Sequence, residues 1–135
     1  RFGDPETQVL MMRLGAQALD LLLACAEGRL DTAKVNWADD HALTVVMAAK
    51  GYPAAYEKGS VIHGLKRIPE DSRHMTFHAG TAEKDGHIVA NGGRVLNITA
   101  RGATLAEARN PANAMIDHLN CPEGFCRSDI GWRAL

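Results

Sequence analysis

The sequence predicts an α+β fold in which two helices lead into a small β-rich unit that carries one further packing helix. Three observations support this prediction. Apolar residues recur at helical spacing before residue 28, short runs of strand-forming residues separated by turn residues follow from residue 42, and a helix-capping sequence appears after residue 103.

The first helix is expected to begin at Asp4-Pro5. The aspartate carboxylate can accept from free backbone amides, and proline at the first helical position loses nothing by lacking its own N–H. This helix should end near Leu14, because Gly15 interrupts the pattern.

A second helix is expected over about 16–27, ending at Gly28, so that the first two helices form a hairpin or a kinked pair. The polar, irregular segment 31–40 around Trp37 is the expected linker. We expect the two helices to expose apolar faces whose natural partner lies elsewhere.

The apolar run 42–49 predicts a buried strand that is stopped by Gly51 and Pro53. A short strand is expected near Val61-Ile62, and strands over 75–82 and 86–90 should flank a tight Asp85-Gly86 turn. Alternation in the run 94–100 places Val95, Asn97 and Thr99 on one face and Arg94, Leu96, Ile98 and Ala100 on the other. Together these strands predict an antiparallel meander.

The last helix is expected to begin after the capping box Thr104-Leu105-Ala106-Glu107 and to run towards Leu119. Pro111 removes one backbone hydrogen bond from it, so we expect a kink, or a helix that restarts with Asn110 as a new cap. In the tail we expect Trp132 to pack back on the sheet.

Composition excludes several classes of function. The chain has 135 residues, enough for one compact domain with some attached structure, and 15 Lys and Arg nearly balance 16 Asp and Glu. Nucleic acid and acidic membranes are therefore not expected as partners. No apolar run approaches the roughly 20 residues that a membrane helix needs. Three scattered cysteines do not suit a disulfide framework, which favours a reducing cytoplasm.

The most suggestive local pattern is Gly92-Gly93-Arg94. Consecutive glycines allow backbone amides to converge on an anion, and an adjacent guanidinium would complete a phosphate cradle. The alternative is an ordinary glycine-rich turn with an exposed arginine. The same choice, between a turn and the polar rim of a pocket, applies to Tyr52 and to the pair His78 and Thr81. No metal site is expected, because Cys121, Cys126 and His118 lack the spacing of a zinc motif.

Five motifs, taken together and in order, resemble the phosphoribosylamine–glycine ligase family, in a version similar to those of alphaproteobacteria. The match extends over essentially the whole chain. The motifs are Arg1–Gln8, Ala48–Pro53, Phe77–Thr81, Gly92–Leu96 and Asp129–Arg133.

The resemblance implies that this chain is the C-terminal part of a longer ligase. Residues 1–38 would be the helical tail of an ATP-grasp domain, and residues 39–135 the small C-terminal domain. The implied enzyme uses ATP and Mg²⁺ to convert glycine to glycyl phosphate, which 5-phosphoribosylamine attacks to give glycinamide ribonucleotide, ADP and phosphate in purine synthesis. The ATP and metal sites would lie mainly upstream, so the fragment is expected to be inactive alone.

The resemblance also implies roles for individual residues. Arg1 would stabilise negative charge at the forming acyl phosphate, and Asp4 would either orient an amine or merely cap a helix. Gly92, Gly93 and Arg94 would hold the 5-phosphate of the ribosyl substrate. Tyr52, His78 and Thr81 would contribute to the rim of that pocket.

This sequence departs from the family pattern at Ala54, where glycine is usual, at Ser128, where a basic residue is common, and at 110–113, which replaces an uninterrupted helix. Two alternatives to the ligase remain open. The chain could be a non-catalytic module that binds a phosphorylated small molecule or a partner protein, or the Gly-Arg turn could be structural only.

Overall fold

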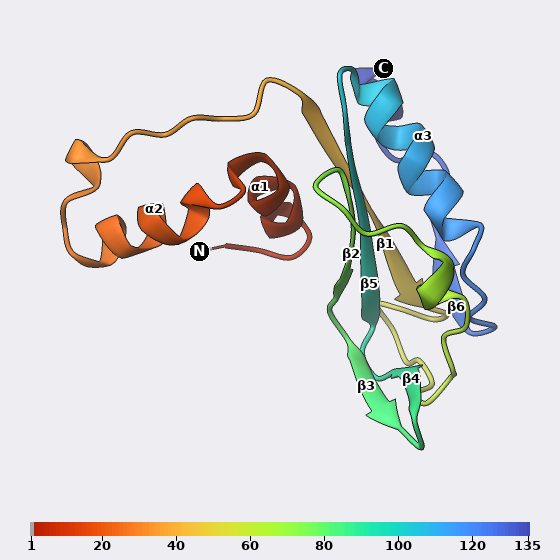
Figure 1. Ribbon diagram of the computed structural model, residues 1–135. Coiled ribbons are helices and arrows are strands. Elements are labelled where there is room, and N and C mark those ends of the chain that lie inside the picture. The colour runs from red at the N-terminus through yellow and green to blue at the C-terminus, as the bar shows by residue number, and fades with distance from the viewer. Residues whose placement is uncertain (1) are drawn as a thin grey trace.

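The computed structural model describes residues 2–135 and has an α+β fold (Figure 1). Three α-helices and two antiparallel sheets make up the described chain. The helices are α1 (Glu6–Leu14), α2 (Gln17–Ala26) and α3 (Leu105–Ile116). The strands are β1 (His41–Ala49), β2 (His74–His78), β3 (Thr81–Lys84), β4 (His87–Ala90), β5 (Arg94–Gly102) and β6 (Gly124–Cys126).

Helix α1 has the expected extent, but its start differs from the prediction. Pro5 is the residue that flanks the helix, and no side chain caps it. The Asp4 carboxylate instead accepts from side chains of α1 and β5, so the helix-cap interpretation of Asp4 is wrong. The carbonyl of Gly3 accepts the first backbone bond, from the Thr7 amide at 2.9 Å.

Helix α2 also matches its predicted range to within a residue or so. Gly15 has φ +58° and separates the two helices, which are bent by 109° relative to one another. Among residues 2–135 no single helix is long and apolar enough to cross a membrane, although this bent pair meets the length and composition of a span. Beyond a short 3₁₀ turn at Leu30–Thr32, the chain runs without regular structure to residue 40, as the predicted linker does.

The main sheet has four strands in the order β2-β5-β1-β6 and is antiparallel throughout. Sequential strands are not neighbours in this sheet, so the meander predicted from the sequence is wrong. The central pair is β1 with β5, which are the two nine-residue strands. Both strands are long and mostly apolar, so their two faces can be buried under other elements. Strands of this kind are expected at the centre of a sheet.

The strand predicted over 75–82 is divided in two. Ala79 and Gly80 leave β2 and both donate their backbone amides to the carbonyl of Val95 at 3.1 Å. β3 then pairs with β4 as a separate hairpin through Asp85 and Gly86, both of which have positive φ, as the Asp-Gly signal predicted. The short strand expected near residue 61 is only an isolated bridge from Val61 to Val89.

A β-bulge in β5 changes the direction of one side chain. Met47 pairs with Leu96, but the next residue, Ala48, pairs with Arg94, so that Val95 is the extra residue. Strict alternation would put Arg94 on the face opposite Asn97. The bulge places it on the same face, as β-bulges commonly do when they re-aim a side chain.

The two faces of the sheet are covered by different helices, with α3 on one side and α1 on the other (Figure 1). The α3 face holds the apolar core, where β5 contributes Leu96, Ile98 and Ala100, all fully buried, and α3 contributes Ala108 and Ala112. α1 packs on β1 and β5 from the other side. Consequently the polar residues of β5 that face α1 are the ones available to build a site.

Helix α3 begins at the predicted capping box, in which the Thr104 hydroxyl accepts from the Glu107 amide at 3.2 Å. The helix then continues through Pro111, so the alternative of a restart at Asn110 is wrong. Burial explains its continuity: Ala108, Ala112 and Met115 all pack into the core, and this packing offsets the missing hydrogen bond.

The tail departs from the prediction in one respect. Trp132 does not pack on the sheet; it is 58% exposed and lies in a short 3₁₀ turn. Ile130 packs against the core instead, and β6 adds a fourth strand beside the end of β1. A further 3₁₀ turn occupies Leu65–Arg67.

Candidate functional site

Asp4 is the centre of a polar cluster that joins the first helix to the sheet. Its Oδ1 accepts from Gln8 Nε2 at 3.0 Å and from Asn97 Nδ2 at 2.9 Å. Its Oδ2 lies 3.0 Å from Arg94 Nε, in an ion pair whose side chains are 31% and 41% exposed. One carboxylate therefore connects α1 to two positions of β5.

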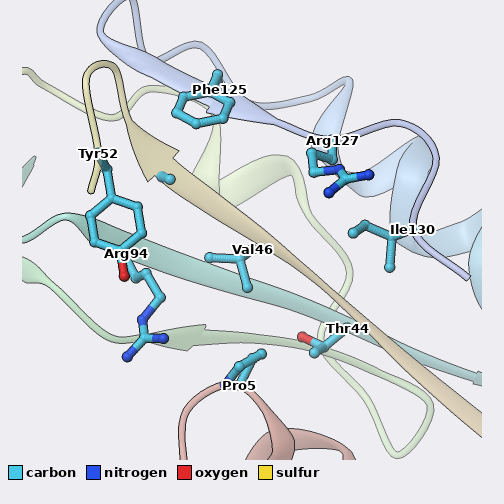
Figure 2. Close-up of a pocket in the computed structure, with 9 residues that line it drawn as sticks. Pro5, Thr44, Val46, Tyr52, Arg94, Phe125, Arg127 and Ile130 are labelled. Atoms are coloured by element: carbon cyan, nitrogen blue, oxygen red, sulfur yellow. The ribbon is translucent and has the colours of Figure 1, made fainter. Parts of the chain in front are cut away.

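Two features of the backbone bring these groups together. The bulge at Val95 puts Arg94 and Asn97 on the α1 face of β5. The segment before α1 carries Asp4 across that face, where Pro5 lies against β1 (Figure 2). The Asp4 contacts thus depend on residues about 90 positions apart in the chain.

A pocket of about 410 Å³ opens beside this cluster. Figure 2 shows Val46 and Thr44 of β1 between two walls, with Tyr52 and Arg94 on one side and Arg127 and Ile130 on the other. Its lining residues are Pro5, Thr44, Val46, Ala48, Tyr52, Arg94, Phe125, Arg127 and Ile130.

Charge in the pocket is of one sign. Two guanidinium groups, of Arg94 and Arg127, line it, and among the described residues no carboxylate does. Arg127 is held by Asp129 through bonds of 2.8 and 2.6 Å, and this bond lowers the pKa of the Asp129 carboxyl. An apolar floor with guanidinium groups at its edges suits a ligand that combines an apolar or sugar body with an anionic group.

The two glycines next to Arg94 have different contacts. The amides of Asn91 and Gly92 both donate to the carbonyl of Gly80, at 2.8 and 2.9 Å. Gly93 has a different function: a Cβ there would lie 2.3 Å from Cδ2 of Tyr52, so only glycine lets that ring pack down. The Gly92 amide is thus engaged within the chain, while the roles assigned to Gly92 and Gly93 as substrate contacts stay predictions.

The other predicted site residues are divided between the pocket and the surface. Tyr52 lines the pocket and packs edge-on against Tyr56, with ring centroids 6.4 Å apart. His78 and Thr81 do not line it; the His78 Nδ1 lies 2.9 Å from the Thr81 hydroxyl, and His78 borders another hollow. Arg1 lies outside the described residues.

The described residues do not fit a magnesium site. Among residues 2–135 no three His, Cys, Asp or Glu side chains gather where they could hold a metal ion. The Asp4 carboxylate, which is the acidic group of the cluster, is already bound by a guanidinium and two amides.

Sequence reasoning missed Gln8, Asn97 and Arg127 as site residues. Asn97 had a detectable signal, because an amide in the middle of the apolar run 94–100 is unusual for a buried strand. Gln8 and Arg127 had none that distinguishes them from ordinary surface residues. Their positions depend on how α1 and the tail cross the sheet.

Comparison with known proteins identifies the family. The model of the phosphoribosylglycinamide synthetase C domain matches residues 42–133. The chain belongs to this family. Family membership agrees with the order of motifs along the sequence. The matched residues include the strands of the main sheet, helix α3 and most of the tail.

Relatives of the C domain family match over the entire chain. Phosphoribosylamine–glycine ligase of Brucella melitensis is 58% identical over 135 residues, covering 100% of this chain and 32% of that protein. The chloroplastic ligase of Arabidopsis thaliana is 50% identical over 137 residues, covering 26% of that protein. The chain thus spans about a third or less of the length of these relatives.

A crystal structure of phosphoribosylamine–glycine ligase from Thermotoga maritima has the same fold. The TM-score is 0.82 at 37% identity, and the match covers 96% of this chain and 31% of that one. The agreement includes the first helices as well as the C domain, since it extends well beyond the 92 residues of 42–133.

Proposed function

We propose that this chain is the C-terminal part of a phosphoribosylamine–glycine ligase, which joins glycine to 5-phosphoribosylamine at the expense of ATP to give glycinamide ribonucleotide, ADP and phosphate. Glycyl phosphate is the proposed intermediate, and purine synthesis in the cytoplasm is the proposed setting. ATP and Mg²⁺ are bound mainly by residues outside this chain. The proposal rests on the relatives that match the whole chain.

The structural observation that supports a substrate site in this chain is the Asp4–Arg94 ion pair at the edge of the pocket. A guanidinium that is 41% exposed remains accessible to a phosphate while Asp4 holds its other side. We assign the 5-phosphate of phosphoribosylamine to Arg94, with Gly92, Gly93 and Tyr52 around it. His78 and Thr81 are assigned at most an outer part of the same substrate path.

Asp4 is proposed to orient an amine, and Arg1 to stabilise the charge of the acyl phosphate. A carboxylate can accept N–H bonds from an amine, and it favours the protonated form when close to it. In this assignment the Arg94 guanidinium binds the phosphate of the ribosyl substrate, and the Asp4 carboxylate binds its amine. Val46 and Ala48 form an apolar floor beside this ion pair.

The experiment is steady-state kinetics of the complete ligase with Arg94→Ala. We expect KM for phosphoribosylamine to rise about 10- to 100-fold, because a charge-assisted bond to phosphate is lost. KM for ATP and for glycine should stay within about two-fold. Arg29→Ala is the matched control, since Arg29 is exposed and its side chain pairs with Glu27, two residues away. An unchanged KM for phosphoribosylamine would overturn the assignment of Arg94.

The 135-residue chain should not turn over by itself. We expect no ADP release when it is mixed with ATP, glycine and phosphoribosylamine. Turnover by the purified fragment would refute the proposal that the ATP and metal sites lie elsewhere.

A further inference from the structure

Asn97 places a polar side chain where the sheet could hold an apolar one. It lies in the centre of β5, is 0% exposed, and is flanked in the sheet by Val46 of β1 and Phe77 of β2. A buried amide costs free energy unless it is hydrogen-bonded, so the bond that it makes is informative. Its Nδ2 donates to Asp4 Oδ1 at 2.9 Å, and the Asp4 carboxylate is therefore the group that Asn97 holds.

The Asp4 carboxylate is held through one of its oxygens by two amides from different elements. Gln8 Nε2 of α1 donates at 3.0 Å to the same Oδ1 atom that accepts from Asn97 of β5. An ionised carboxylate can only accept, so both amides present their nitrogen to it. Two donors on Oδ1 restrict the rotation of the carboxylate, and this restriction fixes the direction in which Oδ2 points.

The second oxygen of Asp4 contacts Arg94 close to the stem of its side chain. Asp4 Oδ2 lies 3.0 Å from Arg94 Nε, which is the guanidinium nitrogen next to that stem. Four of the five N–H donors of a guanidinium are on the two terminal Nη atoms, and these two atoms together can bind a phosphate bidentately. Arg94 is 41% exposed and lines the pocket (Figure 2), so a ligand there can reach it.

The orientation of this guanidinium matters because an arginine side chain is long. An arginine that is free to rotate loses that freedom when it binds an anion, and the loss weakens binding. An arginine that a carboxylate already holds loses less. The bulge at Val95 makes the arrangement possible, since it brings Arg94 to the same face of β5 as Asn97.

We propose that Asn97 is a positioning residue for the anion-binding wall of the pocket and that it acts through Asp4 on Arg94. Asn97 touches no substrate. It holds Asp4 Oδ1, and Asp4 Oδ2 in turn holds Arg94 in an orientation that is ready to receive a phosphate. Gln8 supports the same carboxylate from α1. The inference rests on the proposed function, which assigns the 5-phosphate of phosphoribosylamine to Arg94.

The first measurement is the steady-state kinetics of the complete ligase with Asn97→Leu, which removes the amide at similar volume. We expect KM for phosphoribosylamine to rise about 3- to 10-fold, because Arg94 must then be ordered at the moment when the phosphate binds. This rise should be smaller than the one expected for Arg94→Ala, since the guanidinium itself is still present. Both kcat and the KM values for ATP and glycine should stay within about two-fold of the wild type.

A double-mutant cycle separates positioning from a merely structural role. In an Arg94→Ala background, Asn97→Leu should change KM for phosphoribosylamine by less than about two-fold, because no guanidinium remains to be positioned. A residue that only stabilises the fold would give the same fold-change in both backgrounds. Gln8→Met should follow the same pattern with a smaller rise, and it decides the question if Asn97→Leu does not fold.

Thr99→Val is the matched control, because Thr99 is also fully buried on the α1 face of β5 and its hydroxyl lies 2.7 Å from the hydroxyl of Thr44 rather than near Asp4. It removes a buried polar atom from the same strand without touching the carboxylate. We expect it to alter the unfolding midpoint while leaving KM for phosphoribosylamine unchanged.

Two outcomes overturn the inference while the proposed function stands, provided that Arg94→Ala by itself raises KM for phosphoribosylamine. One is a folded Asn97→Leu enzyme whose KM for phosphoribosylamine is unchanged. The other is an equal rise from Asn97→Leu with and without Arg94, which would mean that the amide acts by another route. An unchanged KM in Arg94→Ala alone would instead refute the assignment of the phosphate to Arg94, and this inference with it.

Discussion

The two faces of the main sheet come from alternating residues of the same strands, yet they differ in chemistry. Under α3, β5 presents Leu96, Ile98 and Ala100, which are all fully buried in the apolar core. Under α1 it presents Asn97 and Thr99, and the layer opens into a pocket edged by two guanidinium groups. The α3 face (the closed face) is an apolar core, whereas the α1 face (the open face) combines buried polar side chains of β5 with a pocket. We therefore expect a substrate to bind on the α1 face.

Truncation of the closed face should have the largest effect. Ile98→Ala removes a fully buried side chain and should lower the free energy of unfolding by about 4 kcal/mol, measured with urea. Val46→Ala, on the open face and only partly buried, should lower it by about 1 kcal/mol. Equal losses would contradict the distinction between the faces.

The closed face should also protect a thiol. Burial raises the pKa of the Cys126 thiol to about 11 from an ordinary 9.0, with a smaller contribution from Cys121. At pH 8 its thiolate fraction should be roughly 100-fold below that of an ordinary thiol, so alkylation should be correspondingly slow. Exposed Cys25 should react first, as mass spectrometry of the labelled peptides can determine.

The sign of the pH dependence follows from that shift. Because the folded pKa of Cys126 is raised, its contribution to stability is complete below about pH 9 and is lost as the pH rises from about 9 towards 11. Cys126→Ala should flatten the decline in stability over this window. A decline of the same slope in the variant would mean that other groups cause it.

Breaking the centre of the open face should have an intermediate effect. Asp4→Ala leaves Arg94 and the Asn97 amide without their partner and should cost about 2 kcal/mol in denaturant unfolding. Asp129→Ala, which breaks a fully exposed pair with Arg127, should change the free energy of unfolding very little. Similar values for both variants would remove the argument that Asp4 ties α1 to the sheet.

A substitution at Gly93 tests how closely the Tyr52 ring packs at the pocket wall. Gly93→Ala places a methyl group against the Tyr52 ring and should cost about 1.5 kcal/mol by forcing that ring to move. In a Tyr52→Ala background the cost should be smaller, because the ring that is 2.3 Å away is gone. An undiminished cost would indicate a clash with the neighbouring Tyr56 instead.

The smallest effect is expected from an unpaired hydroxyl on the closed face. Thr76 pairs with Ile98 across β2 and β5, is buried, and its Oγ1 has no partner among residues 2–135. Thr76→Val should raise the free energy of unfolding by about 0.5 kcal/mol, since a methyl group replaces an unsatisfied donor. A loss of more than 1 kcal/mol would contradict this.

Local signals determined much of the fold. Gly15, the Thr104–Glu107 capping box and Asp85-Gly86 each predicted a boundary that the structure has. The predictions that failed needed distant partners: the strand order, the cap role of Asp4 and the packing of Trp132. The domain boundary near residue 38 and the roles of the site residues stay predictions.

By itself the sequence determined the α+β class, the extents of the first two helices, the start of the third and the presence of an arginine beside two glycines. Local propensity and hydrogen bonding within a few residues decide such features. Only the tertiary structure decided that Val95 bulges, that Arg94 therefore faces α1, and that Asp4 lies against Asn97. The physical reason is that the face on which a side chain lies, and its contacts across the sheet, depend on how the strand pairs with its neighbour. One segment of sequence does not contain that information.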